Sequence, residues 1–132
     1  MPQENRRPIA ILRGKVVSGR KHASSLGFPT INIEYERGSV LPKLSIYAGV
    51  LRHGGKEYRG AICLAPAKEM SRPKLEIFCF DQVPAVPDDE VECIFLGEVG
   101  DLFEGNDEAM KRKIAEDIEK TRGFFLRNNK NG

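Results

Sequence analysis

A polar pair inside an otherwise apolar segment is the first candidate for chemistry. The segment Leu26–Asn32 reads LGFPTIN, and Thr30 and Asn32 stand two positions apart in it. In an extended strand, residues two apart project from the same face. A hydroxyl and a carboxamide oxygen side by side are hard ligands that suit Mg²⁺, which also binds phosphate oxygens. The alternative is a β-turn leading into an edge strand, with both side chains in local hydrogen bonds, and the pattern alone favours this alternative.

A single glutamate is the second candidate. In the segment Lys74–Phe80, which reads KLEIFCF, alternation places Glu76, Phe78 and Phe80 on one face. Both faces are apolar apart from Glu76, so we expect its carboxylate to lie in a partly desolvated place, where it can act as a general base. The alternative is a glutamate that reaches solvent or pairs with an arginine such as Arg72. The residues leave the two alternatives open.

The loop Val17–Ser25 is a third and weaker candidate. It contains glycine, serines and the run Arg20, Lys21 and His22, which could supply backbone N–H groups and positive charge to a triphosphate. It matches neither the P-loop nor the dinucleotide-binding fingerprint. Both histidines of the chain, His22 and His53, lie in expected loops, so we expect neither a histidine-based triad nor a zinc site.

Short apolar runs separated by turn residues must position these side chains. Their spacing is typical of a mainly β protein, and the glycine pair in His53–Lys56 indicates a hairpin turn. The predicted strands cover Ala10–Val17, Thr30–Ile33, Ile46–Arg52, Tyr58–Leu64, Lys74–Phe80 and Val91–Leu96.

A helix is predicted after the last strand. Met110, Ile114 and Ile118 recur at every fourth position, Asn106 can cap the N-terminus and Gly123 can end the helix. The basic run 111–113 is expected on the solvated face of this helix. Six short strands and one helix favour a small closed or nearly closed antiparallel barrel with the helix packed outside. We expect one domain over residues 1–132, with residues 1–8 flexible.

Composition excludes several classes of function. The 132 residues carry 21 basic and 19 acidic side chains, a net charge of +2 that is too small for a general binder of nucleic acids or membrane surfaces. The 3 cysteines lie singly in apolar runs, which favours reduced buried thiols over disulfides or zinc ligands. The chain shows no signal peptide and no membrane span, so a cytoplasmic protein is expected.

The order and spacing of these segments resemble the riboflavin kinase (flavokinase) family of bacteria and eukaryotes. The resemblance runs from about Gly14 to Thr121, and its strongest part is LGFPTIN, which is close to the family's LG-x-PTAN signature. It continues through Pro42, Ile46-Tyr47, Leu75-Glu76, Phe95-Leu96, Phe103, Ile114 and Asp117-Ile118.

The resemblance implies a six-stranded antiparallel Greek-key barrel with an outer C-terminal helix. It also implies a Mg²⁺-dependent kinase that transfers the terminal phosphate of ATP to the ribityl 5′-hydroxyl of riboflavin and yields FMN. By this resemblance Glu76 is the catalytic base, and Thr30 and Asn32 hold the metal. The implied nucleotide-binding residues are Gly14, Gly19, Lys21, Gly27, Pro29, Thr30 and Asn32. The implied flavin-binding residues are Leu96, Glu98, Phe103 and Met110.

The sequence departs from the family mainly on the flavin side. Ser24 replaces a basic residue, Phe78 stands where histidine is common, and Gly97 stands where arginine is usual. These departures keep open a second hypothesis, a catalytically weak protein that binds a flavin or a nucleotide. A nucleic-acid-binding barrel is disfavoured by the low net charge and the absence of tryptophan. The kinase is expected to act as a monomer on small-molecule substrates, without membrane or nucleic-acid partners.

Overall fold

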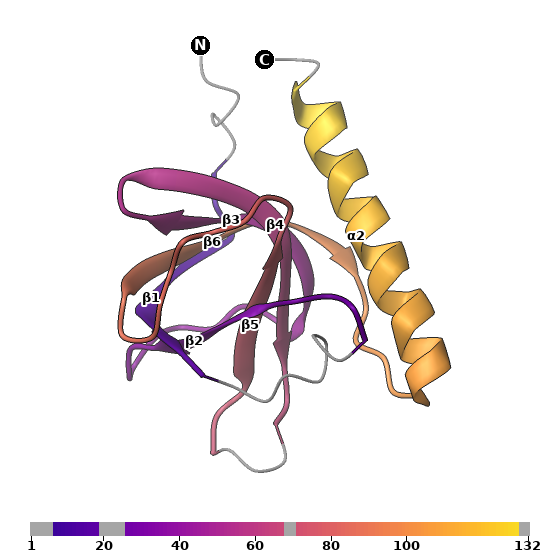
Figure 1. The fold of residues 1–132 in the computed structure, drawn as a ribbon, viewed down its shortest axis with the longest axis horizontal. Helices are drawn as coiled ribbons and strands as arrows, with labels where there is room; N and C mark the ends of the chain where they lie inside the picture. Colours follow the sequence, from indigo (N-terminus) through magenta and orange to yellow (C-terminus); the bar gives the residue numbers. More distant parts are fainter. Residues whose placement is uncertain (1–6, 19–25, 68–70, 130–132) are drawn as a thin grey trace.

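The computed structural model describes residues 7–18, 26–67 and 71–129, which form six strands and one helix (Figure 1). Residues 19–25, and with them Gly19, Lys21 and most of the predicted phosphate loop, lie outside the described residues, as do residues 1–6 of the segment predicted to be flexible. The elements are β1 (Ala10–Val17), β2 (Ile31–Tyr35), β3 (Ser45–His53), β4 (Lys56–Ala65), β5 (Lys74–Cys79), β6 (Glu90–Gly100) and α2 (Asp107–Asn129).

The strands close into an antiparallel barrel in the order β1-β2-β5-β4-β3-β6. Strands β3, β4 and β5 follow one another as hairpins, and β6 returns to lie beside β3, which is the Greek-key arrangement. The β3–β4 turn is made by Gly54 and Gly55, whose φ angles of 59° and 83° suit glycine. The predicted mainly β barrel with an outer helix is therefore confirmed.

Because side chains alternate along each strand, one set fills the barrel interior and the other set faces outward. Inward-facing side chains from all six strands form one buried cluster, which comprises Leu12, Val16, Ile33, Tyr35, Tyr47, Leu51, Ile62, Leu64, Leu75, Ile77, Val91, Cys93 and Phe95. Residues of the opposite parity face outward. Asn32, Glu76 and Phe78 therefore lie on the outer surface of the barrel.

The helix packs on this outer surface through its C-terminal half. Ala48, Val50 and Ile94 from the barrel form a second buried cluster with Phe124 and Phe125 of α2. Figure 1 shows α2 standing beside the barrel as a separate layer. No helix in the described part of the chain is long and apolar enough to cross a membrane.

The helix does not end at Gly123, as predicted, but continues to Asn129. Glycine costs about 1 kcal/mol in a helix interior, but ending the helix there would withdraw the next two residues, Phe124 and Phe125, from their buried cluster. The predicted N-cap is confirmed, since the amide of Ala109 donates to Asn106 Oδ1 at 2.8 Å.

The strand boundaries were predicted less well than the strands themselves. Strand β2 begins at Ile31 rather than Thr30, and β6 runs four residues beyond the predicted end, to Gly100. The β3–β6 pairing contains register shifts between Ile46 and Tyr47 and between Ala48 and Gly49, where alternation does not hold.

Gly97 allows the close approach between β6 and α2. A Cβ atom at this position would lie 2.5 Å from Cε2 of the buried Phe124 ring. We expect Gly97→Ala to lower the free energy of unfolding by about 1–3 kcal/mol, measured by urea denaturation. Leucine lacks the ring atoms that clash, so Gly97→Ala/Phe124→Leu should lose less than the sum of the two single variants. Additive losses would contradict the contact.

Candidate active site

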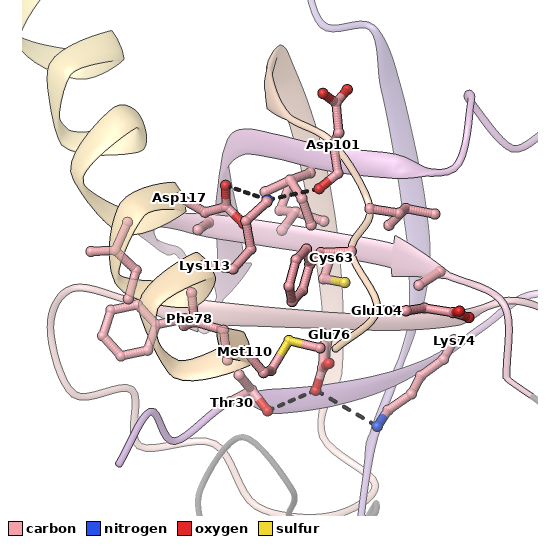
Figure 2. A pocket seen from close by; sticks show the side chains of 18 of the residues that line it. Thr30, Cys63, Lys74, Glu76, Phe78, Asp101, Glu104, Met110, Lys113 and Asp117 are labelled. Carbon is pink, nitrogen blue, oxygen red and sulfur yellow. Dashed lines mark hydrogen bonds and ion pairs between the residues drawn. The ribbon is translucent and has the colours of Figure 1, made fainter. Parts of the chain in front are cut away.

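Two of the residues singled out in the sequence are in direct contact. Thr30 Oγ1 donates a hydrogen bond of 2.8 Å to Glu76 Oε1 (Figure 2). Thr30 immediately precedes β2, and Glu76 lies in β5, which pairs with β2. Donation uses only the proton of the hydroxyl, so the lone pairs of Thr30 Oγ1 remain available to accept another group.

Asn32 completes this cluster. It lies directly opposite Glu76 in the β2–β5 register, so both side chains share the outer face of the barrel. The Asn32 side chain is buried, and its Oδ1 has no hydrogen-bond partner among the described residues. A buried oxygen without a partner costs about 1–3 kcal/mol. Such an atom therefore indicates a place where a bound group supplies the missing interaction.

The donor set of this cluster fits a hard cation. A hydroxyl, an amide oxygen and a carboxylate are the ligands that Mg²⁺ accepts, with water or phosphate oxygens in its other positions. The described residues contain no cluster of three or more histidine, cysteine, aspartate or glutamate side chains arranged to bind a metal. A cation bound here would therefore take its side-chain ligands from Thr30 and Asn32 rather than from a cluster of carboxylates.

Lys74 places a positive charge next to the cluster. Its Nζ lies 3.8 Å from Glu76 Oε1, the oxygen that also accepts from Thr30 (Figure 2). Both side chains are largely shielded from solvent, with 26% and 18% of their surfaces exposed. The sequence analysis assigned no role to Lys74, although its position two before Glu76 already placed the two side chains on one face.

A pocket of about 590 Å³ opens beside the Thr30–Glu76 pair. It lies between the outer face of β4 and β5, the segment 101–104 and the N-terminal half of α2. The volume is that of a pocket for a small organic ligand. Its apolar lining comprises Ile46, Ala61, Ile62, Ala65, Pro66, Phe78, Leu102, Phe103, Met110, Ile114 and Ile118.

The structure brings some of the predicted flavin-binding residues to this pocket and not others. Phe103 and Met110 line it together with Glu76. Leu96 instead packs against the cluster beneath α2. Glu98 accepts a hydrogen bond of 2.5 Å from Ser45 and is paired with Lys43. Neither Leu96 nor Glu98 is among the residues that line the pocket.

The predicted nucleotide-binding glycines Gly14 and Gly27 have different structural roles. Gly27 has a φ of 98° in the turn before Thr30. Gly14 faces β2 so closely that a Cβ atom would lie 2.2 Å from the carbonyl oxygen of Glu34. Pro29 follows the turn and is exposed. Gly27, Pro29 and Thr30 are contiguous, whereas Gly14 lines a different groove.

One expectation about the helix is wrong. Lys113 was expected on the solvated face with the rest of the basic run, but its side chain is only 16% exposed and lines the pocket. It pairs with Asp117, which lies four positions further along the helix. The i,i+4 spacing of Lys113 and Asp117 was the signal in the sequence that could have identified this pair.

Comparison with known proteins assigns the family. The family model of flavokinase (riboflavin kinase) matches residues 6–125. A curated bifunctional riboflavin kinase/FMN adenylyltransferase from Listeria monocytogenes is 27% identical over 122 residues, covering 87% of this chain and 38% of that protein. The chain therefore spans well under half the length of this relative.

Solved structures share the fold. A riboflavin kinase from Trypanosoma brucei superposes with a TM-score of 0.60 at 26% identity, over 88% of this chain and 79% of that chain. A macrolide-efflux protein from Streptococcus pneumoniae gives a TM-score of 0.77 at 20% identity, over 87% of this chain and 38% of that chain, a likeness of fold alone. Fold and family together define a small barrel of the kinase class. The chain belongs to the riboflavin kinase family.

The wall of the pocket contains a cysteine that should be chemically inert. Burial raises the pKa of Cys63, and likewise that of Cys79, to about 12. Because the thiolate is the reactive form, a raised pKa leaves almost none of it at pH 8. We expect iodoacetamide to alkylate Cys63 at least about 100-fold more slowly than a free thiol, followed by mass spectrometry. Unfolding in urea should remove the protection, and rapid labelling of the folded protein would contradict the raised pKa of this thiol.

Proposed function

We propose that this protein is a riboflavin kinase that transfers the terminal phosphate of ATP to the ribityl 5′-hydroxyl of riboflavin. One observation carries the proposal: the Thr30–Glu76 hydrogen bond lies at an apolar pocket of ligand size, and beside it lies the Asn32 oxygen, which has no partner among the described residues. A base, a set of oxygen ligands and a site for an aromatic ring therefore occupy one surface. The family membership supports the same assignment.

Glu76 acts as the general base in this reaction. Its Oε1 is engaged by Thr30 and lies near Lys74, which orients the carboxylate and leaves Oε2 to receive the proton of the 5′-hydroxyl. As the proton leaves, the hydroxyl oxygen forms a bond to the γ-phosphorus, and the bond from that phosphorus to the β,γ-bridging oxygen breaks. The products are FMN and ADP. The carboxylic acid then returns its proton to solvent.

Thr30 and Asn32 hold the metal and the phosphates. When bound, Mg²⁺ neutralises the negative charge of the triphosphate. Thr30 lines the pocket, and Asn32 lies opposite Glu76 on the outer face of the barrel. The two side chains therefore set the position of the phosphates relative to Glu76. Positioning of this kind supplies much of the rate acceleration in phosphoryl transfer.

The apolar walls of the pocket bind the flavin ring. Ala61 and Ala65 are small side chains on the outer face of β4, and they leave space that larger residues would fill. Phe103 and Met110 contribute large, polarisable surfaces from the opposite walls. Removal of the ring from water gives the binding free energy that holds the ribityl chain near Glu76.

Glu76→Gln should remove most of the activity while leaving the fold intact, because the amide keeps the size of the carboxylate but cannot accept the proton. We expect kcat to fall by about 10²–10⁴-fold, measured as FMN formed from riboflavin, ATP and Mg²⁺. The matched control is Glu34→Gln, which removes an exposed carboxylate of the neighbouring strand away from the pocket. Full activity of Glu76→Gln would exclude this base. Flavin binding without turnover by the unaltered protein would favour the binding-protein hypothesis.

Asn32→Leu should separate folding from metal binding. The substitution removes a buried oxygen that has no partner among the described residues and keeps the side-chain volume, so we expect an unchanged or higher unfolding temperature. The concentration of Mg²⁺ at half-maximal activity should rise by about tenfold or more. Both quantities are measured on the same preparation. An unaltered Mg²⁺ dependence would exclude Asn32 as a metal ligand.

A further inference from the structure

Lys113 and Asp117 form a charged anchor on the pocket wall formed by α2. The ammonium group of Lys113 donates to both carboxylate oxygens of Asp117, at 2.8 and 2.7 Å, and to the backbone oxygen of Asp101 at 2.7 Å. These three contacts use all three of its donors. In Figure 2 the group lies on the opposite side of the pocket from Thr30 and Glu76.

The anchor is held away from solvent. The side chains of Lys113 and Asp117 are only 16% and 9% exposed. Burial raises the pKa of the Asp117 carboxyl, and the hydrogen bond from Lys113 opposes that shift. A charge in such a place is costly unless its partner and its hydrogen bonds are in position. The geometry of this pair is therefore strongly constrained.

Asp117, the acidic residue of the anchor, also packs against the end of β6. Gly100 is the last residue of β6, and a Cβ atom there would lie 2.5 Å from Asp117 Oδ1. Glycine at this position thus allows the Asp117 carboxylate to approach the backbone of β6 closely. Asp101, the next residue, supplies the carbonyl that Lys113 binds. The anchor consequently fixes the point at which the chain leaves the barrel.

The segment 101–105 that follows has little else to hold it. It contains no strand or helix, and in the described part of the chain none of its residues makes a backbone–backbone hydrogen bond. It nevertheless forms a wall of the pocket through Leu102 and Phe103, whose surfaces are 37% and 38% exposed. Large apolar side chains that line a pocket and remain this exposed are available to a ligand.

We propose that Lys113, together with Asp117, is a positioning residue for the flavin. By fastening Asp101 to α2, the pair holds segment 101–105 where Leu102 and Phe103 cover the ring. The inference rests on the proposed function, and it assigns to this pair an effect on flavin affinity rather than on phosphoryl transfer. Nothing in the geometry places Lys113 near Glu76, so its loss should act on one substrate only.

The first test is Lys113→Met, which keeps most of the side-chain length and removes the donors. We expect the KM for riboflavin and the Kd from quenching of riboflavin fluorescence to rise by about tenfold. kcat should stay within about twofold and the KM for ATP should not change. Lys111→Met is the matched control, because Lys111 is exposed on the same helix and does not line the pocket.

The second test is Gly100→Ala, which acts on the anchor from a residue that does not line the pocket. Displacement of the Asp117 carboxylate should raise the KM for riboflavin, and the effect should be less than additive with that of Lys113→Met. Backbone NMR order parameters of segment 101–105 should fall in both variants, while those of β1 and β2 stay unchanged. Lys113→Arg should restore part of the flavin affinity. If Lys113→Met fails to fold, Gly100→Ala and Lys113→Arg decide the question.

The outcomes separate this inference from the proposed function. Unchanged riboflavin Kd and KM in folded Lys113→Met, or a fall in kcat alone, would overturn the positioning role while leaving a riboflavin kinase. Absence of FMN formation by the unaltered protein would instead overturn the proposed function. In that case the flavin Kd of the variants and the backbone order parameters of segment 101–105 still decide whether the anchor shapes the pocket.

Discussion

The antiparallel register between β2 and β5 is the constraint on which the site depends. It sets Asn32 directly opposite Glu76 and brings Thr30, just before β2, within hydrogen-bonding distance of the same carboxylate. A slip of one residue would turn these polar side chains into the barrel interior and expel Ile33, Leu75 or Ile77. The register is therefore held by apolar side chains that face away from the site and never touch a ligand. Mutation of these interior residues should therefore disturb the relative positions of Thr30, Asn32 and Glu76 without altering any of the three side chains.

Apolar side chains of all six strands fill the barrel interior, so a binding site on the outer surface needs a second wall. The helix supplies that wall, because its C-terminal half packs on the barrel while its N-terminal half lines the pocket. Phe124 and Phe125 bind the C-terminal half tightly to β3 and β6, where Gly97 permits close approach. The N-terminal half stands off from β4 and β5 and leaves the pocket between them. The pocket therefore lies at the end of the helix opposite to the packed Phe124 and Phe125.

The sequence predicted what alternation and local chemistry determine, and missed what long-range packing determines. Six strands, the N-cap at Asn106 and the shared face of Thr30 and Asn32 follow from periods and residue types, which act locally. The position of Glu76 opposite Asn32 depends instead on the pairing of β2 with β5. The continuation of α2 past Gly123 depends on a cluster formed with β3 and β6, which no local pattern contains. The contact of Lys113 with the backbone oxygen of Asp101 also depends on packing, because Asp101 lies in the segment between β6 and the helix, 12 positions before Lys113. The family resemblance could name Leu96 and Glu98 as flavin-binding residues, but it could not show that this chain uses them in packing and in a contact with Ser45.

The departure of this sequence from its family at Phe78 has a physical explanation in the outer surface of β5. Phe78 lies two residues after Glu76 on the same face, and its ring meets Phe28 edge to face with centroids 6.3 Å apart. Phe28 belongs to the segment that carries Thr30, so β5, which carries Glu76, also holds the segment of Thr30 in place. On its other side Phe78 contacts Phe80, which in turn contacts Phe125 of α2. A histidine at this position would add a polar group but weaken an apolar row that connects Phe28 to the helix. Phe78 therefore contributes to the position of Thr30 relative to Glu76.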